Sequence, residues 1–199
     1  PFYGAGHLSA RSLHARGRAV EVDGASYPYR QAICIAGLVY ALLGIWMAIR
    51  ATQHLFPPSI AVTAAALTIG GSFMLWYSLA EPTMTHAPAM ASVAGFVWYW
   101  VATHDRRSLG HWIGRGALAG FMTMIRWQCA LFAVLPAWEA ASMLWRAWRG
   151  RDAAIIRTVL IGGLAFAAAA TLAFVPQMLA WKAIYGQYLA VSPVGPQIR

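Results

Sequence analysis

Apolar residues run almost without interruption from residue 31 to residue 181, in segments whose lengths match the thickness of a lipid bilayer. A helix needs about 20 apolar residues, with a range of about 17 to 25, to cross the hydrocarbon core. The pattern therefore predicts an all-α fold, a polytopic transmembrane helix bundle with about six spans. The candidate spans are residues 31–49, 59–80, 87–103, 113–125, 129–145 and 155–181.

The fourth candidate span is too short to cross a bilayer alone. It crosses only if it borrows residues 126–128; otherwise it is partly re-entrant. Around the transmembrane domain of residues 31–181 we expect two extracytoplasmic parts, a loop at residues 1–30 and a segment at 182–199. The chain does not begin with Met and ends in a stretch rich in Pro and Gly. We therefore expect an internal fragment of a longer polytopic protein.

The positions of the basic residues predict the orientation of the bundle, because Lys and Arg are retained on the cytoplasmic side of membranes. The basic loops are Arg50 with His54, residues 106–115 and residues 146–157. Six crossings place all three in the cytoplasm and leave residues 81–86 and 126–128 outside. The segment 1–30 is an exception to this rule, since it carries four arginines on the outer side.

Composition supports an integral membrane protein and excludes other classes. The chain is 60% hydrophobic and 11% charged, whereas about a quarter of the residues of a soluble domain are charged. The net charge of +9 does not indicate a nucleic-acid partner, because the arginines cluster at the ends of apolar segments and no recognition motif accompanies them. Cys34 and Cys129 lie inside apolar stretches, which favours packing over a disulfide or a metal site.

The break between the second and third spans holds an ionisable pair, Glu81 and His86. Pro82 disfavours helical geometry at Glu81, so the second span should end there, and Thr85 can cap the next helix. Both side chains would then lie on one membrane surface. Glu81 either forms an ion pair with Arg126, or it acts with His86 in binding or proton transfer at the outer leaflet.

Arg126 and Gln128 form the second candidate site, at the mouth of the short fourth span. Arg126 either snorkels to water or holds a lipid phosphate, because a guanidinium presents a donor fork that matches phosphate oxygens. Glu139, inside the fifth span, is interpreted as a snorkelling or internally paired acid rather than a proton relay.

Two further patterns concern packing. Trp145 and Trp148 are expected near the headgroup level of the membrane. Pairs of small residues permit close helix approach at Gly70-Gly71, Gly116-Ala117 and Gly162-Gly163.

The order of several motifs resembles that of the GT-C superfamily of polytopic membrane glycosyltransferases, the fold of protein O-mannosyltransferases and of aminoarabinose transferases. The motifs are Pro1-Phe2-Tyr3 with His7, residues 23–29 (DGASYPY), residues 81–87 (EPTMTHA), residues 116–120 (GALAG) and residues 125–128 (IRWQ). The resemblance implies a bacterial inner-membrane enzyme that takes a sugar from a polyprenyl-phosphate donor on the extracytoplasmic face. It also implies a catalytic aspartate in an outer loop, which would lie upstream of Pro1.

On this reading Glu81 and His86 have supporting or acid–base roles, and Arg126 with Gln128 binds the lipid phosphate. We expect no cofactor, and the need for a divalent metal stays open. A transporter or flippase segment and a structural membrane subunit remain the alternatives. A short fourth span is compatible with a transporter, whose helices are often broken near the midplane.

Overall fold

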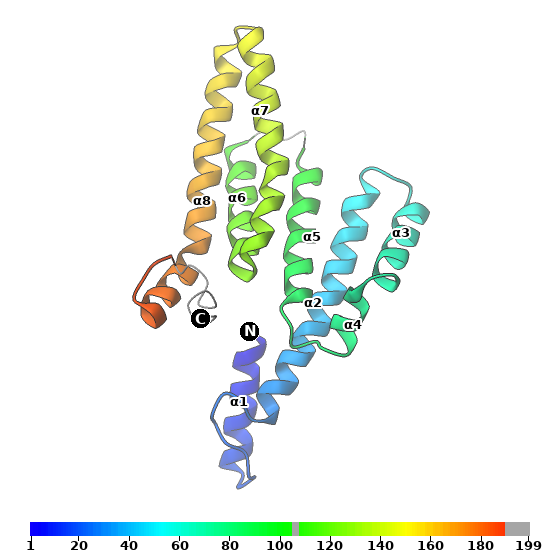
Figure 1. Ribbon diagram of the computed structural model, residues 1–199, viewed down its shortest axis with the longest axis vertical. Coiled ribbons are helices and arrows are strands. Elements are labelled where there is room, and N and C mark those ends of the chain that lie inside the picture. Colours follow the sequence, from blue (N-terminus) through cyan, green and yellow to red (C-terminus); the bar gives the residue numbers. More distant parts are fainter. Residues whose placement is uncertain (105–107, 190–199) are drawn as a thin grey trace, which may run out of the picture. The chain divides into compact units, whose positions relative to one another are not determined.

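The computed structural model describes residues 1–104 and 108–189, and within these ranges every regular element is a helix (Figure 1). The predicted all-α fold is confirmed for this part of the chain. The contacts divide the chain into two compact units, Pro1–Ala102 and a second unit that begins at Thr103.

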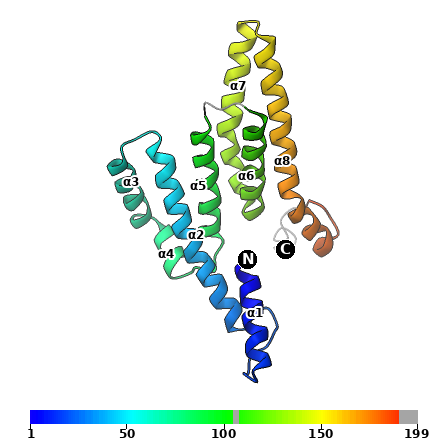
Figure 2. The ribbon, with the colours of Figure 1, turned by 180° about the vertical axis from the view of Figure 1, so that it is seen from behind.

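The first unit is built around its longest helix, α2, which packs against α1 and α5 (Figure 2). Its helices are α1 (Phe2–Ala15), α2 (Tyr27–Gln53), α3 (Pro58–Gly70), α4 (Phe73–Leu79) and α5 (His86–Ala102). Gly44 lets α2 approach α5 closely, since a Cβ atom at this position would lie 3.1 Å from the backbone of Ala91. The expected spans 31–49 and 87–103 correspond to α2 and α5.

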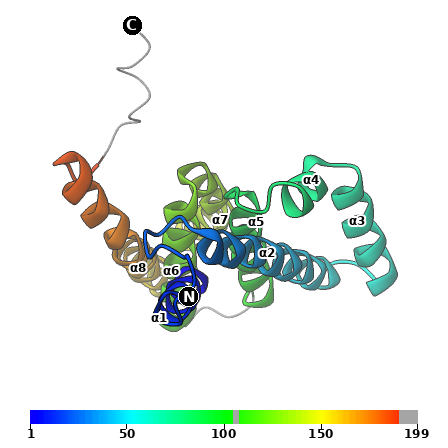
Figure 3. The same ribbon diagram turned by 90° about the horizontal axis from the view of Figure 1, so that it is seen from below.

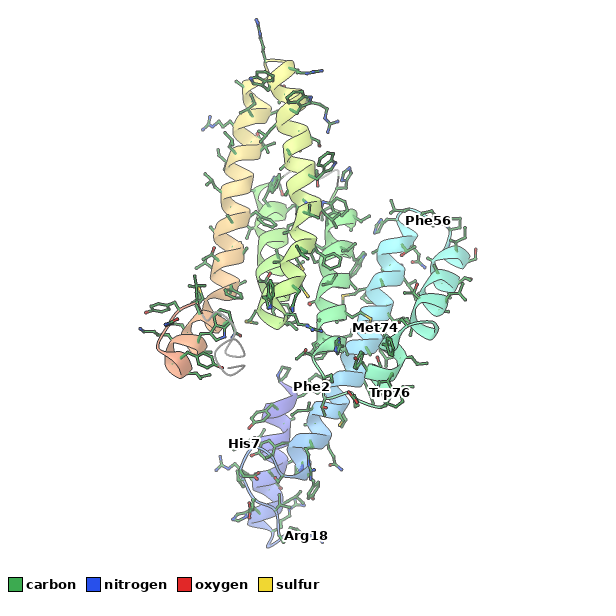
Figure 4. The ribbon with its side chains drawn as sticks, viewed as in Figure 1. Phe2, His7, Arg18, Phe56, Met74 and Trp76 are labelled. Atoms are coloured by element: carbon green, nitrogen blue, oxygen red, sulfur yellow. The ribbon has the colours of Figure 1, made fainter. Side chains whose placement is uncertain are left out.

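The expected outer loop at residues 1–30 contains a helix, α1, which packs on the start of α2. His7 Nδ1 is hydrogen-bonded to the hydroxyl of Tyr29 at 2.7 Å, and the Phe2 ring meets the Tyr40 ring edge-on at 5.8 Å. Tyr29 is only 1% exposed and shares a small core with Ala10. Figure 4 shows Phe2 and His7 along α1, with Arg18 beyond its far end.

Asp23 forms a turn directly before α2. Its Oδ1 accepts hydrogen bonds from the backbone N–H groups of Ala25, at 2.9 Å, and Ser26, at 2.8 Å. These hydrogen bonds to the charged form hold the pKa of the Asp23 carboxyl below its usual value. Asp23 therefore shapes the entry into α2.

The expected second span does not form one helix, and this corrects the prediction over residues 59–80. It is divided into α3 and α4, which are bent by 74° relative to each other. Gly70 and Gly71 end α3, and the Ser72 hydroxyl accepts a hydrogen bond from the N–H of Met74 at 3.3 Å, which caps α4. The bend turns α4 towards α2 and α5 (Figure 3).

The second unit contains α6 (Leu109–Ile125), a 3-10 helix η1 (Trp127–Ala133), α7 (Val134–Arg149) and α8 (Ala153–Tyr185). Helices α7 and α8 form a hairpin that extends past α6 (Figures 1 and 2). The contact between α6 and α8 depends on glycines. A Cβ atom on Gly116 or Gly120 would overlap a backbone carbonyl of α8, and one on Gly162 would lie 2.5 Å from the Trp112 indole. The expected close approach is thus confirmed at Gly116 and Gly162.

Two helices, α2 and α8, are long and apolar enough to cross a membrane, and the bent pair α3–α4 is a third if its two pieces act as one span. This indicates an integral membrane protein. Six spans are not confirmed, because α5, α6 and α7 have 17, 17 and 16 residues, fewer than the about 20 that a crossing usually needs. The basic pair Arg106-Arg107 and the end of the expected segment 182–199 lie outside the described residues.

Candidate functional site

Glu81 and His86 lie at the two ends of a tight link between α4 and α5, as the sequence predicted. The N–H of Glu81 donates to the Trp76 carbonyl at 3.3 Å, and the N–H of Met84 donates to the Glu81 carbonyl at 3.1 Å. His86 is the first residue of α5, directly after Thr85. One turn therefore carries a carboxylate and an imidazole, both half-buried.

The link is packed against neighbouring elements of the first unit. The His86 ring stacks on the Tyr77 ring, with the centroids 3.9 Å apart and the planes 17° from parallel. Pro82 lies directly on α2, because a Cβ atom on Gly37 would overlap the Pro82 carbonyl. These contacts fix the backbone that carries Glu81 and orient the imidazole of His86.

Arg126 and Gln128 lie in the second unit, where α6 gives way to η1. Helix α6 ends at Ile125, and Arg126 takes an extended conformation with φ −148° and ψ 122°. Of the two alternatives for the fourth span, a helix that continues through residues 126–128 is therefore not the one that forms. Arg126 is half-buried and Gln128 is exposed, so the break presents polar side chains beside the exposed ring of Trp127.

The four candidate residues thus form two pairs, Glu81 with His86 in one unit and Arg126 with Gln128 in the other. The ion pair between Glu81 and Arg126 stays a prediction. Within the described ranges, no group of three or more His, Cys, Asp and Glu side chains could hold a metal ion.

The structure also contains a buried polar cluster around Arg115, whose side chain is 1% exposed. The guanidinium Nη2 donates to the Thr103 carbonyl at 2.6 Å, and Nη1 lies 3.5 Å from Glu139 Oε2. Glu139 is 6% exposed, and His104 Nδ1 lies 3.8 Å from its Oε1. The Trp112 ring lies 5.7 Å from the guanidinium carbon.

The cluster confirms that Glu139 is an internally paired acid, but it shows that the assignment of Arg115 to a basic loop is wrong. Arg115 lies within α6, which begins at Leu109, ahead of the expected start at residue 113. A signal was present in the sequence. Trp112, Arg115, Ala119 and Met122 recur at helical spacing, and all four are buried.

The three arrangements differ in the chemistry that they offer. The link at 81–86 offers a carboxylate and an imidazole that can accept or donate a proton at a surface. The break at Arg126 offers a donor fork that suits a phosphate. The Arg115–Glu139 pair is enclosed and joins a side chain of α6 to one of α7.

Comparison with known proteins adds no family to this description: no protein-family model, no curated protein and no solved structure matches the chain.

Proposed function

We propose that the chain is part of a membrane-embedded glycosyltransferase that moves a sugar from a polyprenyl-phosphate donor to an acceptor on the extracytoplasmic face. The observation that carries the proposal is the packed link at residues 81–86. It coincides with the EPTMTHA motif of the GT-C resemblance, and its half-buried Glu81 and stacked His86 are held by contacts with α2 and Tyr77.

The proposed roles follow from what sugar transfer requires. An acceptor hydroxyl needs a base, and the leaving lipid phosphate needs stabilisation of its negative charge. Glu81 and His86 assist at the acceptor, as binding or acid–base groups beside a catalytic aspartate from another part of the enzyme. Arg126, with Gln128, binds the donor phosphate at the helix break. This function requires six membrane crossings, with the link at residues 81–86 and the helix break at residues 126–128 both on the outer side.

The test replaces Arg126 in the full-length enzyme and measures transfer from a polyprenyl-phosphate sugar in proteoliposomes. Arg126→Ala should lower kcat/KM roughly 100-fold, because one charge-assisted phosphate contact is lost. Arg126→Lys should recover part of this loss, since Lys also binds phosphate as a point charge. Arg16→Ala, at an exposed position directly after α1, is the matched control. Unchanged transfer by Arg126→Ala at normal expression removes Arg126 from the mechanism.

The bent pair α3–α4 supports a second candidate, a transporter or flippase segment, because broken helices form binding sites in transporters. The same proteoliposomes distinguish the two functions. A transporter moves the lipid-linked sugar between leaflets without forming a glycosylated acceptor, whereas a transferase forms the product. The third alternative is a purely structural role, in which Glu81 and Arg126 only form an ion pair. Full sugar transfer by the charge-swapped Glu81→Arg/Arg126→Glu protein would support this role.

A further inference from the structure

The turn between α7 and α8 gathers exposed arginines and tryptophans. We call this group the hairpin tip; it consists of Trp145, Arg146, Trp148, Arg149, Arg151 and Arg157, all exposed. Trp145 is 55% and Trp148 67% exposed, so both indoles are available to a partner beside the arginines. The tip is the part of the hairpin that extends furthest beyond α6 (Figure 1).

Part of the hairpin tip is hollowed. An open pocket of about 520 Å³ is lined by Trp148, Arg149, Arg151, Ala153 and Ile156. The Arg149 guanidinium lies 4.8 Å from the centre of the Trp145 ring, and the two indoles lie 5.8 Å apart. The pocket therefore combines two cations with an apolar wall.

The positive charge of the tip is poorly balanced within its own segment. Residues 145–157 contain four arginines and one acid, Asp152. Asp152 is engaged as the N-cap of α8, where its Oδ1 accepts hydrogen bonds from the N–H groups of Ala154 and Ile155, each at 3.1 Å. That carboxylate also covers the first N–H groups of α8, so an anion would have to be held by the arginines.

The position of the tip along α8 indicates what covers it. The apolar stretch of α8 begins after Arg157, and Ala153 lies about 6 Å further along the helix axis. The headgroup layer on each side of a bilayer is about 5–7 Å thick. The pocket therefore falls at the depth of lipid phosphates, where tryptophans are also enriched.

We propose that the hairpin tip binds the headgroup of an anionic phospholipid, with Arg149 and Arg151 holding the phosphate and the indoles resting on the adjoining glycerol and acyl carbons. This site anchors the hairpin to one membrane surface. It is separate from the residues proposed for sugar transfer and does not depend on that activity.

Native mass spectrometry of the detergent-solubilised protein tests the site, with phosphatidylglycerol and phosphatidylcholine as probes. Arg149→Gln/Arg151→Gln should weaken phosphatidylglycerol binding by roughly 30-fold and phosphatidylcholine binding much less, because the choline cation cancels the charge of the phosphate that the arginines hold. Arg16→Gln/Arg18→Gln removes the same charge from an exposed turn of the first unit and should have little effect. An equal loss in both double variants would show that only total charge matters, and would overturn the site.

Two further measurements test whether the ligand is free phosphate and whether the double variant is still folded. Excess inorganic phosphate should not displace phosphatidylglycerol; if it does, the pocket is a site for free phosphate and the lipid assignment is wrong. Circular dichroism checks that the double variant keeps its helix content. If it does not, Arg149→Gln alone should lose about 5-fold in binding, and an unchanged affinity would contradict the proposal.

Discussion

Arg115 is a charged side chain held almost entirely inside the second unit. Burial of a guanidinium is costly unless its charge is paired and its N–H groups have acceptors. Glu139 supplies the opposite charge, and Thr103 supplies both a carbonyl and a hydroxyl oxygen. The pair therefore places one buried charge against another, and the loss of either side chain removes an opposite charge from beside the one that remains.

We predict that Glu139→Gln destabilises the protein by about 3–5 kcal/mol, because it removes the carboxylate charge that faces the buried Arg115 guanidinium. Arg115→Met/Glu139→Leu should cost much less, since both charges are removed together. Thermal unfolding in detergent, followed by circular dichroism, measures both effects. Arg157→Met, at an exposed arginine, is the control. A melting temperature of Glu139→Gln equal to that of the control would contradict a stabilising role for the pair.

Only part of the arrangement of the candidate site could be predicted from the sequence. The end of a helix just before Pro82 and the start of one at His86 followed from Pro82 and Thr85, although α4 already ends at Leu79, two residues ahead of the expected end at Glu81. The stacking of His86 on Tyr77 was not foreseeable, since it depends on how α4 is turned after its bend. Arg115 was missed because its charge was interpreted as a loop signal before the periodicity around it was considered.

At the scale of the helices, glycine positions decide how closely α6 and α8 pack. Gly162 and Gly163 are neighbours in α8 and face different surroundings. Gly162 faces the Trp112 ring, which is only 3% exposed, whereas a Cβ atom on Gly163 would meet nothing within 4 Å. The pair therefore offers a matched comparison within one helical turn.

We expect Gly162→Ala to destabilise the protein by about 1–3 kcal/mol, because the methyl group overpacks the helix interface. Gly163→Ala should be neutral or stabilise the protein by up to about 1 kcal/mol, because alanine favours the helix. The thermal midpoints of the two variants, measured side by side, check the difference. Equal midpoints would mean that Trp112 does not limit the approach of α6 to α8.

The sequence predicted the approximate positions of α2, α5 and α8 but not the irregular elements between them. Apolar composition reports that a segment is buried in protein or lipid, and it is almost insensitive to a break in the backbone. The sequence signal for the bend was Gly71, which ends α3, followed by Ser72, which caps α4. The bend could be predicted only by considering these two residues together. The 3-10 helix η1 has no comparable signal, because its residues are as apolar as those of the helix that follows.

At the scale of the whole molecule, the predicted orientation assigns each connecting segment to one side of the membrane. Thr83, in the link of the candidate site, should face the outer solution, and Gly150, at the hairpin tip, should face the cytoplasm. Both positions are exposed, and neither requires a positive φ. Cysteines placed there should react with a membrane-impermeant maleimide from opposite sides.

The experiment uses a background in which Cys34 and Cys129 are replaced by alanine, with intact cells and inside-out vesicles labelled in parallel. Thr83→Cys should be modified in intact cells and Gly150→Cys in inside-out vesicles. Labelling of both positions from one side would refute the six-crossing arrangement. Labelling of Thr83→Cys only in inside-out vesicles would also place the proposed transfer site on the cytoplasmic face, away from a donor on the outer leaflet.

The buried Arg115 also bears on how the chain enters the membrane during synthesis. An arginine near the centre of a helix costs about 2.5–3.5 kcal/mol on the translocon scale, and α6 carries it on only 17 residues that include several glycines. We therefore expect α6 to leave the translocon laterally only together with α7, once Glu139 has been made. A truncated chain that carries α6 without α7, followed by a soluble tag, should leave α6 outside the lipid, as glycosylation mapping can show, whereas one that includes α7 should have it inserted.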